Sequence, residues 1–179
     1  MKKEIIAKGF MMTFAMLLMA TLTWAQGDKA SRPSPPQTAS GKVGGANITI
    51  SYSSPSVKGR KIFGDLVPYD KVWRAGANEA TIFETDKAVT IGGKQLPAGK
   101  YSLYAIPGAS EWTFIFNSET GQWGIKRTGD TSKDASKDVL SVTAKPAKSA
   151  SMNEKLKYEV TSTGFTLLWD NTEVPVAIK

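Results

Sequence analysis

The stretch EWTFIFN, residues 111–117, determines the expected fold. Its aromatic residues Trp112, Phe114 and Phe116 stand at every second position. Successive side chains of an extended chain point to opposite faces, so the three rings share one face. The stretch therefore predicts a β-strand with one face packed in a core.

The same period of two recurs on both sides of this stretch. Alternating runs occur at ANITISY, TIFE, AVTI, KYSLYAI, VLSVTA, KLKYEV, GFTLLWD and TEVPVAI. Turn signals such as GGKQLPAG separate them, and no segment favours an amphipathic helix of three turns. About eight to ten short strands with frequent turns predict an all-β fold, an antiparallel β-sandwich of jelly-roll-like type in a single domain. Pro175 cannot donate to a strand ladder, which places the last strand at an edge.

The N-terminus has the pattern of a secretory signal peptide over residues 1–25. A basic start, MKKEIIAK, precedes the apolar run FMMTFAMLLMATLTW, and TWA then places small residues at the two positions that a signal peptidase reads. The run is shorter than the ~20 residues of a membrane-spanning helix. We therefore expect cleavage after Ala25, export to the periplasm or the extracellular space, and no stable membrane insertion of the mature chain.

Residues 26–42, QGDKASRPSPPQTASGK, are rich in Pro, Ser and Gly and almost without apolar side chains. Such a segment buries too little surface to offset its ordering entropy, which predicts a flexible tether. The β-sandwich domain is expected to span residues 43–179. Within it, KRTGDTSKDASK (residues 126–137) and AKSASMN (residues 147–153) are predicted to be exposed loops.

Composition excludes several classes of chemistry. The 179 residues include no His and no Cys, which removes Ser-His-Asp and Cys-His nucleophiles, disulfides and most zinc, copper and iron sites. No glycine-rich phosphate loop is present. We expect neither a metal nor a cofactor. The formal charge is +7, of which residues 1–25 contribute +2, and the basic residues are not clustered with aromatics, so nucleic-acid binding is not expected.

The polar stretch VWRAGANEAT, residues 72–81, interrupts the alternating strands and supports two interpretations. In the first, Arg74 and Glu79 meet across a turn as a buried clamp, with Trp73 filling the end of the core. In the second, these residues and Asn78 form a polar site beside an aromatic surface, which suits a glycan or a small polar ligand. The clamp is the favoured interpretation at this stage.

The preceding segment SVKGRKIFGDLVPYDKV adds Arg60 and Tyr69, which can line the mouth of such a site. The same segment is equally consistent with a long, well-packed crossover loop. Trp123, between glycines, is either a stacking surface or a plug of the sandwich end.

The sequence resembles a known family in the segments PSVKGRKIFGDLVPYDKVWRAGANEAT, VTIGGKQLPAGKYSLYAIPG, EWTFIFN, QWG and LLWDNTEVPVAI. It is similar, from about Ser51 to the C-terminus, to the bacterial domain of unknown function 2911. The resemblance implies an exported, compact, β-rich protein of Bacteroidetes type, and it implies no established activity, cofactor or catalytic residue. Residues 128–136 are richer in lysine and serine than is typical of the family.

These observations favour a non-catalytic module that binds a glycan or another envelope component. The candidate ligand-binding residues are Arg60, Tyr69, Trp73, Arg74, Asn78 and Glu79. One alternative is a glycosidase-like hydrolase that uses Glu79 with a second acid, because glycosidases act through a pair of carboxylates. The other is an interaction or scaffolding module that works through a sheet edge or face.

Overall fold

The computed structural model describes residues 29–179 and divides the chain into two units, Met1–Arg32 and Pro33–Lys179. The described part of the first unit contains one short 3-10 helix, η1 (Lys29–Ser31). The predicted signal peptide, residues 1–25, lies outside the described residues. Within residues 29–179, no helix has the length and hydrophobicity that a membrane crossing requires.

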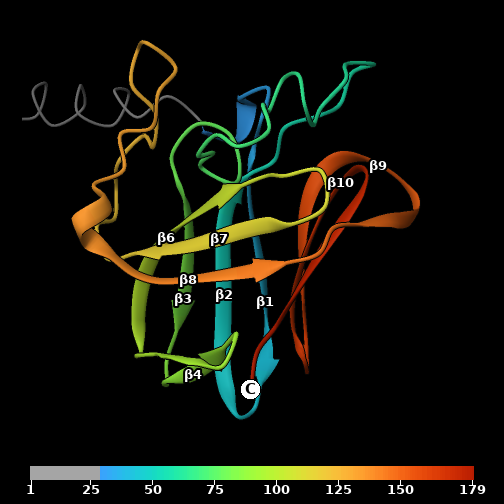
Figure 1. Ribbon diagram of the computed structural model, residues 1–179. Helices are drawn as coiled ribbons and strands as arrows, with labels where there is room; N and C mark the ends of the chain where they lie inside the picture. Colours follow the sequence, from blue (N-terminus) through green and yellow to red (C-terminus); the bar gives the residue numbers. More distant parts are fainter. Residues whose placement is uncertain (1–28) are drawn as a thin grey trace, which may run out of the picture. The chain divides into compact units, whose positions relative to one another are not determined.

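The second unit is built from ten strands and one 3-10 helix (Figure 1). They are β1 (Pro36–Val43), β2 (Ala46–Ser53), β3 (Thr81–Thr85), β4 (Val89–Ile91), β5 (Lys94–Leu96), β6 (Gly99–Ile106), β7 (Trp112–Asn117), η2 (Ala135–Lys137), β8 (Asp138–Ala144), β9 (Ala147–Thr161) and β10 (Gly164–Ala177). All strand pairs within the three sheets are antiparallel. The predicted antiparallel, sandwich-like all-β domain is confirmed.

Six strands form the main sheet, in the order β1-β2-β3-β6-β7-β8. Strands β9 and β10 form a long hairpin, and β4 and β5 form a short one. The C-terminal residue Lys179 exchanges backbone hydrogen bonds with Thr90 of β4, at 2.7 and 2.9 Å. The last strand belongs to a two-stranded sheet and therefore lies at an edge, as Pro175 predicts.

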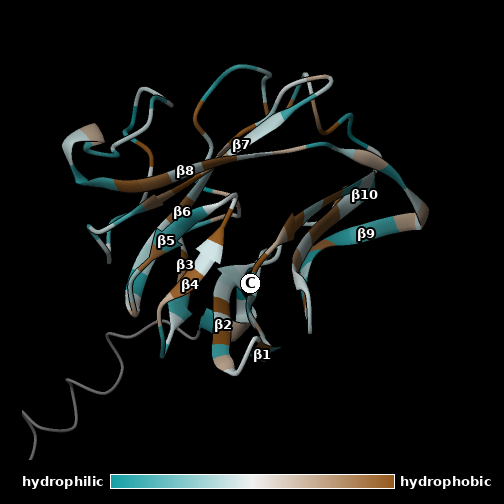
Figure 2. Cartoon of the chain, turned by 60° about the horizontal axis from the view of Figure 1, so that its bottom comes forward, coloured by the Kyte–Doolittle hydropathy of each residue, from teal (hydrophilic) through white to brown (hydrophobic). Residues whose placement is uncertain are grey.

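The core lies between the main sheet and the β9–β10 hairpin. Phe165 of β10 packs on Phe83 of β3 and Phe114 of β7, with ring centroids 5.9 and 5.6 Å apart. Trp112, Phe114 and Phe116 are at most 1% exposed and belong to this core, as their alternation predicts. Figure 2 shows the same alternation as hydrophobic and hydrophilic bands along β2.

The opposite face of the main sheet is buried over a smaller area. Ala80, Tyr104 and Ile115 form a second cluster there, with Val72 and Ile106 packed against it. Tyr104 is fully buried although it points away from the main core. The Tyr104 hydroxyl accepts a hydrogen bond from Gln122, in the loop after β7.

The tether prediction was wrong for its C-terminal half, because β1 occupies Pro36–Val43. All eight residues of β1 pair with β2, from Pro36 opposite Ser53 to Val43 opposite Ala46. The strand also packs against β9, where a Cβ on Gly41 would lie 3.0 Å from Val160. Backbone pairing needs no apolar side chains, so composition alone did not reveal this strand.

The loop predicted at residues 147–153 is the first half of β9. It pairs with β10 through an irregular ladder, with Asn153 opposite Asp170 and Lys148 opposite Thr172. Four of these residues, Ala147, Lys148, Ala150 and Ser151, are exposed and either small or lysine, so the sequence shows no alternation of apolar and polar side chains here. The other predicted loop, residues 126–137, is a loop that ends in η2. The segment before β3, residues 54–80, is also a packed loop, with Val57, Ile62 and Val67 buried.

Candidate ligand-binding cleft

The stretch at residues 72–81 is fixed to both the main sheet and the hairpin. Trp73 and Ala105 of β6 exchange two backbone hydrogen bonds, at 2.7 and 2.8 Å. The chain then turns through Ala75, which adopts a φ of 52°. This turn directs the Ala75 carbonyl into the core, where it accepts hydrogen bonds from the hydroxyls of Thr81 (3.0 Å) and Tyr158 (2.8 Å).

Trp73 fills the end of the core, as the clamp interpretation predicts. Its ring stacks on Trp169 of β10 at 6.0 Å and 18°, and it packs edge to face with Phe63 and Trp112, each at 6.3 Å. Its indole N–H donates to the Gly76 carbonyl at 3.0 Å. The orientation of this ring is therefore fixed by the fold.

Arg74 is half-buried and held by the loop that follows β7. Its Nη1 donates to the Trp123 carbonyl at 3.2 Å, and its Cζ lies 5.4 Å from the centroid of the Trp123 ring. Burial lowers the pKa of Arg74, while the nearby Glu79 carboxylate acts in the opposite direction. Trp123 is 49% exposed, so its ring covers the arginine and does not plug the sandwich.

A cleft of about 750 Å³ opens beside Trp73 and Arg74. Two loops form most of it, one over residues 54–80 and the other over residues 118–134, and these loops lie at the same end of the domain (Figure 1). The lining residues are Ser34, Pro55, Arg60, Leu66, Val67, Pro68, Asp70, Lys71, Val72, Trp73, Arg74, Gly76, Ala77, Ile125, Thr128, Gly129, Asp130, Thr131 and Trp169. This volume is in the range of small-molecule sites, roughly 300–1,000 Å³.

The charged side chains of the cleft have different surroundings. Arg60 donates through Nε to the Val57 carbonyl at 3.0 Å and through Nη2 to the Ser56 carbonyl at 2.6 Å. The two acids of the lining, Asp70 and Asp130, are exposed. Arg60 and Lys71 are exposed as well, and among the charged residues of the lining Arg74 is the half-buried one.

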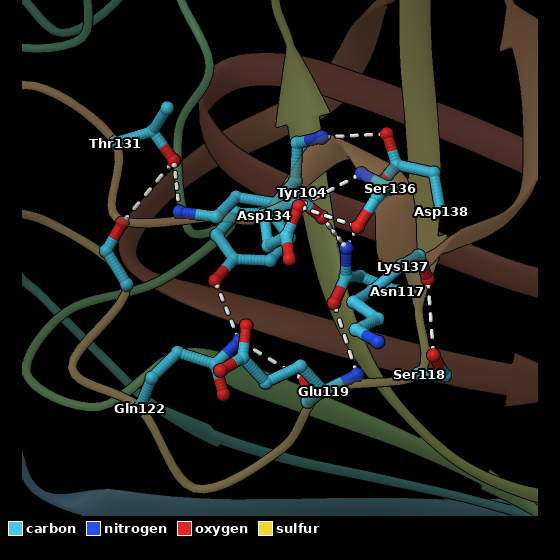
Figure 3. A network of polar contacts seen from close by, with 12 residues as sticks. Tyr104, Asn117, Ser118, Glu119, Gln122, Thr131, Asp134, Ser136, Lys137 and Asp138 are labelled. Carbon is cyan, nitrogen blue, oxygen red and sulfur yellow. Dashed lines mark hydrogen bonds and ion pairs between the residues drawn. The ribbon is translucent and has the colours of Figure 1, made fainter.

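The second loop is anchored by a polar network on the far face of the sheet (Figure 3). Asn117 donates to the Asp134 carbonyl and to the Asp138 carboxylate, at 2.8 and 2.7 Å. Asp138 also pairs with Lys133, whose side chain is only 6% exposed. Gln122 donates to the Tyr104 hydroxyl at 2.9 Å. These contacts hold the loop that carries the Thr128–Thr131 wall.

Three buried polar atoms have no hydrogen-bond partner in the described part of the chain: Gln122 Oε1, Ser132 Oγ and Trp169 Nε1. Two of them, Gln122 and Ser132, lie in the second loop, and Gln122 belongs to the network of Figure 3. Trp169 lies in the cleft wall, with the Phe63 ring perpendicular to it at 5.9 Å.

Three of the six predicted site residues, Arg60, Trp73 and Arg74, line the cleft together. Tyr69 instead lines a small separate cavity of about 70 Å³, beside Phe63 and Trp112. Glu79 and Asn78 are not among the residues that line either cavity.

Asn78 has a structural role in this arrangement. It adopts a φ of 57°, and its Nδ2 donates to the Ser34 carbonyl at 2.9 Å. The side chain therefore ties the turn to the segment before β1.

Sequence reasoning missed Lys71, Asp130 and Trp169 as lining residues. Lys71 lies within residues 56–72, the segment that supplied the candidates Arg60 and Tyr69. Its position next to Asp70 was the signal that could have identified it as a further polar residue of the site. Asp130 and Trp169 are distant in sequence from residues 60–74, and only the folded chain brings them to the cleft. Among the described residues, no group of three or more Asp and Glu side chains is placed to hold a metal ion.

Comparison with known proteins locates the chain within one family. No curated protein and no solved structure matches it significantly. A family model matches residues 34–178, nearly the whole of the strand-bearing unit, including β1 and both cleft-forming loops. The chain belongs to this family, described as proteins of unknown function (DUF2911).

Proposed function

We propose that this domain is an exported binding module that takes a glycan or another small polar component of the cell envelope into its cleft. The observation that carries the proposal is the cleft of about 750 Å³ with Trp73 and the guanidinium groups of Arg60 and Arg74 in its wall. Such sites combine apolar and aromatic walls with a few fixed polar groups, which give orientation and specificity. The signal-peptide pattern of residues 1–25 supports export.

The rigidity of the wall supports binding. Trp73 is held by its indole hydrogen bond and by stacking, and the arginines are held by backbone carbonyls. Groups fixed before the ligand arrives lose little conformational entropy on binding, so preorganisation favours affinity.

A cavity-filling substitution tests the proposal. Ala77 lines the cleft and is half-buried, so Ala77→Trp places an indole in the space that a ligand would occupy. We expect the wild-type domain to bind at least one member of a panel of neutral and acidic oligosaccharides, and Ala77→Trp to weaken that binding by about tenfold or more.

The control is Ala98→Trp, at an exposed position between β5 and β6 that does not line the cleft. It should bind the same oligosaccharide as the wild type does. Titration calorimetry measures both variants, and thermal unfolding verifies that they are folded. The proposal fails if the wild type binds no member of the panel, or if both tryptophan variants bind equally well.

A hydrolase is the second candidate, because two acids, Asp70 and Asp130, line the same cleft. Glu79, on which the sequence-based hydrolase hypothesis relied, is not a lining residue. A hydrolase would release reducing ends from an oligosaccharide that the cleft binds, and Asp70→Asn or Asp130→Asn would abolish this release. Binding without release supports the non-catalytic module.

A further inference from the structure

We infer that the ligand of this cleft is an acidic saccharide and that Arg60 and Arg74 bind its carboxylate. The inference rests on the proposed function and deepens it by naming the ligand class. It follows from the way in which the two guanidinium groups are held and from the placement of the acids around them.

Arg60 is oriented by its own loop. Nε and Nη2 donate to the carbonyls of Val57 and Ser56, three and four residues earlier in the chain. These two bonds occupy one edge of the planar guanidinium and orient the exposed side chain beside the cleft. Among the described residues, no carboxylate forms an ion pair with Arg60.

Arg74 is oriented from the other loop. Its Nη1 donates to the Trp123 carbonyl, and its Cζ lies over the Trp123 ring, 5.4 Å from the ring centroid. Gly124 makes this arrangement possible, because a Cβ there would lie 2.9 Å from the Cβ of Arg74. Burial destabilises the charged guanidinium, and the nearby Glu79 carboxylate acts in the opposite direction. A bound anion adds to this compensation more effectively than a neutral hydroxyl does.

The rest of the lining agrees with an anion at the walls. Lys71 adds a third cation, so the lining carries three cations against two acids, Asp70 and Asp130. Arg74 is half-buried, whereas the other four charged side chains are exposed. The Asp130 carboxylate accepts the Thr128 hydroxyl at 3.0 Å, which turns it toward its own loop. Planar guanidinium groups match the geometry of a carboxylate, with paired N–H donors in a fixed fork.

The saccharide part of the inference comes from Trp73 in the same wall. An indole ring beside fixed polar donors suits the mixed surface of a sugar, which presents C–H groups on one side and hydroxyls at its edge. Both Trp73 and Trp169 belong to the cleft, so occupancy will change the intrinsic tryptophan fluorescence.

The test compares a trisaccharide of galacturonic acid with its methyl ester, a neutral molecule of nearly the same shape. Tryptophan fluorescence titration should give an affinity for the acid about tenfold or more above that for the ester. Arg60→Gln and Arg74→Gln should each lower the affinity for the acid by about tenfold and leave the ester unchanged. Arg60→Lys keeps the charge without the fork and should lose less affinity than Arg60→Gln.

Arg127→Gln is the matched control, because Arg127 is exposed on the second loop and does not line the cleft. Equal affinity for acid and ester, or an equal loss in Arg127→Gln and Arg60→Gln, would overturn the inference and leave the proposed function standing. A sulfated neutral trisaccharide that binds more tightly than the galacturonate would overturn the assignment to a carboxylate. If neither trisaccharide nor any oligosaccharide of the panel binds, the proposed function fails as well.

Discussion

At the scale of single residues, the cleft depends on a few backbone positions that only particular residues tolerate. Gly124 adopts a φ of 87° directly beneath Arg74. Its carbonyl accepts the Ser132 N–H at 3.2 Å, which closes the second loop. A side chain at this position would separate Arg74 from Trp123 and open that loop.

Gly124→Ala should therefore destabilise the domain more than Gly121→Ala does. Gly121 has a similar φ of 89°, but a Cβ there would meet nothing within 4 Å. Both variants carry the cost of a left-handed alanine, about 1–2 kcal/mol. Gly124→Ala adds overpacking against Arg74 and Ala80, about 1–3 kcal/mol. Urea unfolding measures the difference, and equal losses in the two variants would contradict the proposed packing.

At the scale of elements, the second loop, residues 118–134, forms one wall of the cleft, and polar contacts in its interior hold it in place. The Lys133 side chain is almost fully buried, and its charge is matched by Asp138 at the junction of η2 and β8. A buried ion pair adds little net stability compared with an apolar pair, but leaving one partner alone is costly. The position of the wall therefore depends on the Asp138 side chain.

We expect Asp138→Asn to lower the free energy of unfolding by about 2–4 kcal/mol, because it removes the carboxylate that pairs with the buried Lys133 ammonium. Glu159→Gln is the matched control. Its pair with Lys157 is exposed, with side-chain exposures of 51% and 45%, and its loss should cost less than about 1 kcal/mol. Thermal and urea unfolding of both variants would test this, and a similar small loss in both would show that the loop does not depend on the buried pair.

At the scale of the whole molecule, one aromatic core joins the main sheet to the β9–β10 hairpin. Three buried tyrosines, Tyr52, Tyr101 and Tyr158, belong to this core, and a fourth, Tyr104, is buried on the opposite face of the main sheet. Burial raises the pKa of Tyr52, Tyr101, Tyr104 and Tyr158 and is the largest cause in each case. The pKa of the buried Tyr158 lies well above its usual value. The unfolded chain ionises these tyrosines near pH 10, whereas the folded chain keeps them neutral. Their contribution to stability is thus fully present below about pH 10 and is lost as the pH rises through the folded pKa values.

Stability should accordingly be level from neutral pH to about pH 9 and fall steeply above about pH 10.

Tyr158→Phe should be about 1 kcal/mol less stable at neutral pH, because the Ala75 carbonyl loses one of its two donors. The same variant should show a shallower alkaline decline, by about 1.4 kcal/mol per pH unit for one proton. Urea unfolding across this pH range measures both effects, with Tyr69→Phe, at a ring 41% exposed, as the control. An unchanged alkaline slope in Tyr158→Phe would contradict this account.

The sequence by itself determined the fold class, most strands and the faces that they bury. Trp112, Phe114 and Phe116 illustrate why: alternation along one strand is a local property, and local periodicity fixes which side chains share a face. The same locality explains the two errors. Residues 36–43 and 147–153 are strands whose ladders are held by backbone hydrogen bonds, and a hydrogen-bonded backbone leaves no mark in the order of apolar side chains.

Only the tertiary structure decided which polar residues face one cleft. Sequence proximity correctly grouped Arg60, Trp73 and Arg74 as residues of one site. For the same reason it also grouped Tyr69, Asn78 and Glu79 with them, and these three do not line the cleft. A cleft is formed where loops from distant parts of the chain meet, and a turn of a few residues moves a side chain from one surface to another. Trp169 and residues 128–131 line the cleft because the main sheet and the hairpin pack together. Contacts between distant parts of the chain decide where these loops lie, and no local sequence pattern encodes those contacts.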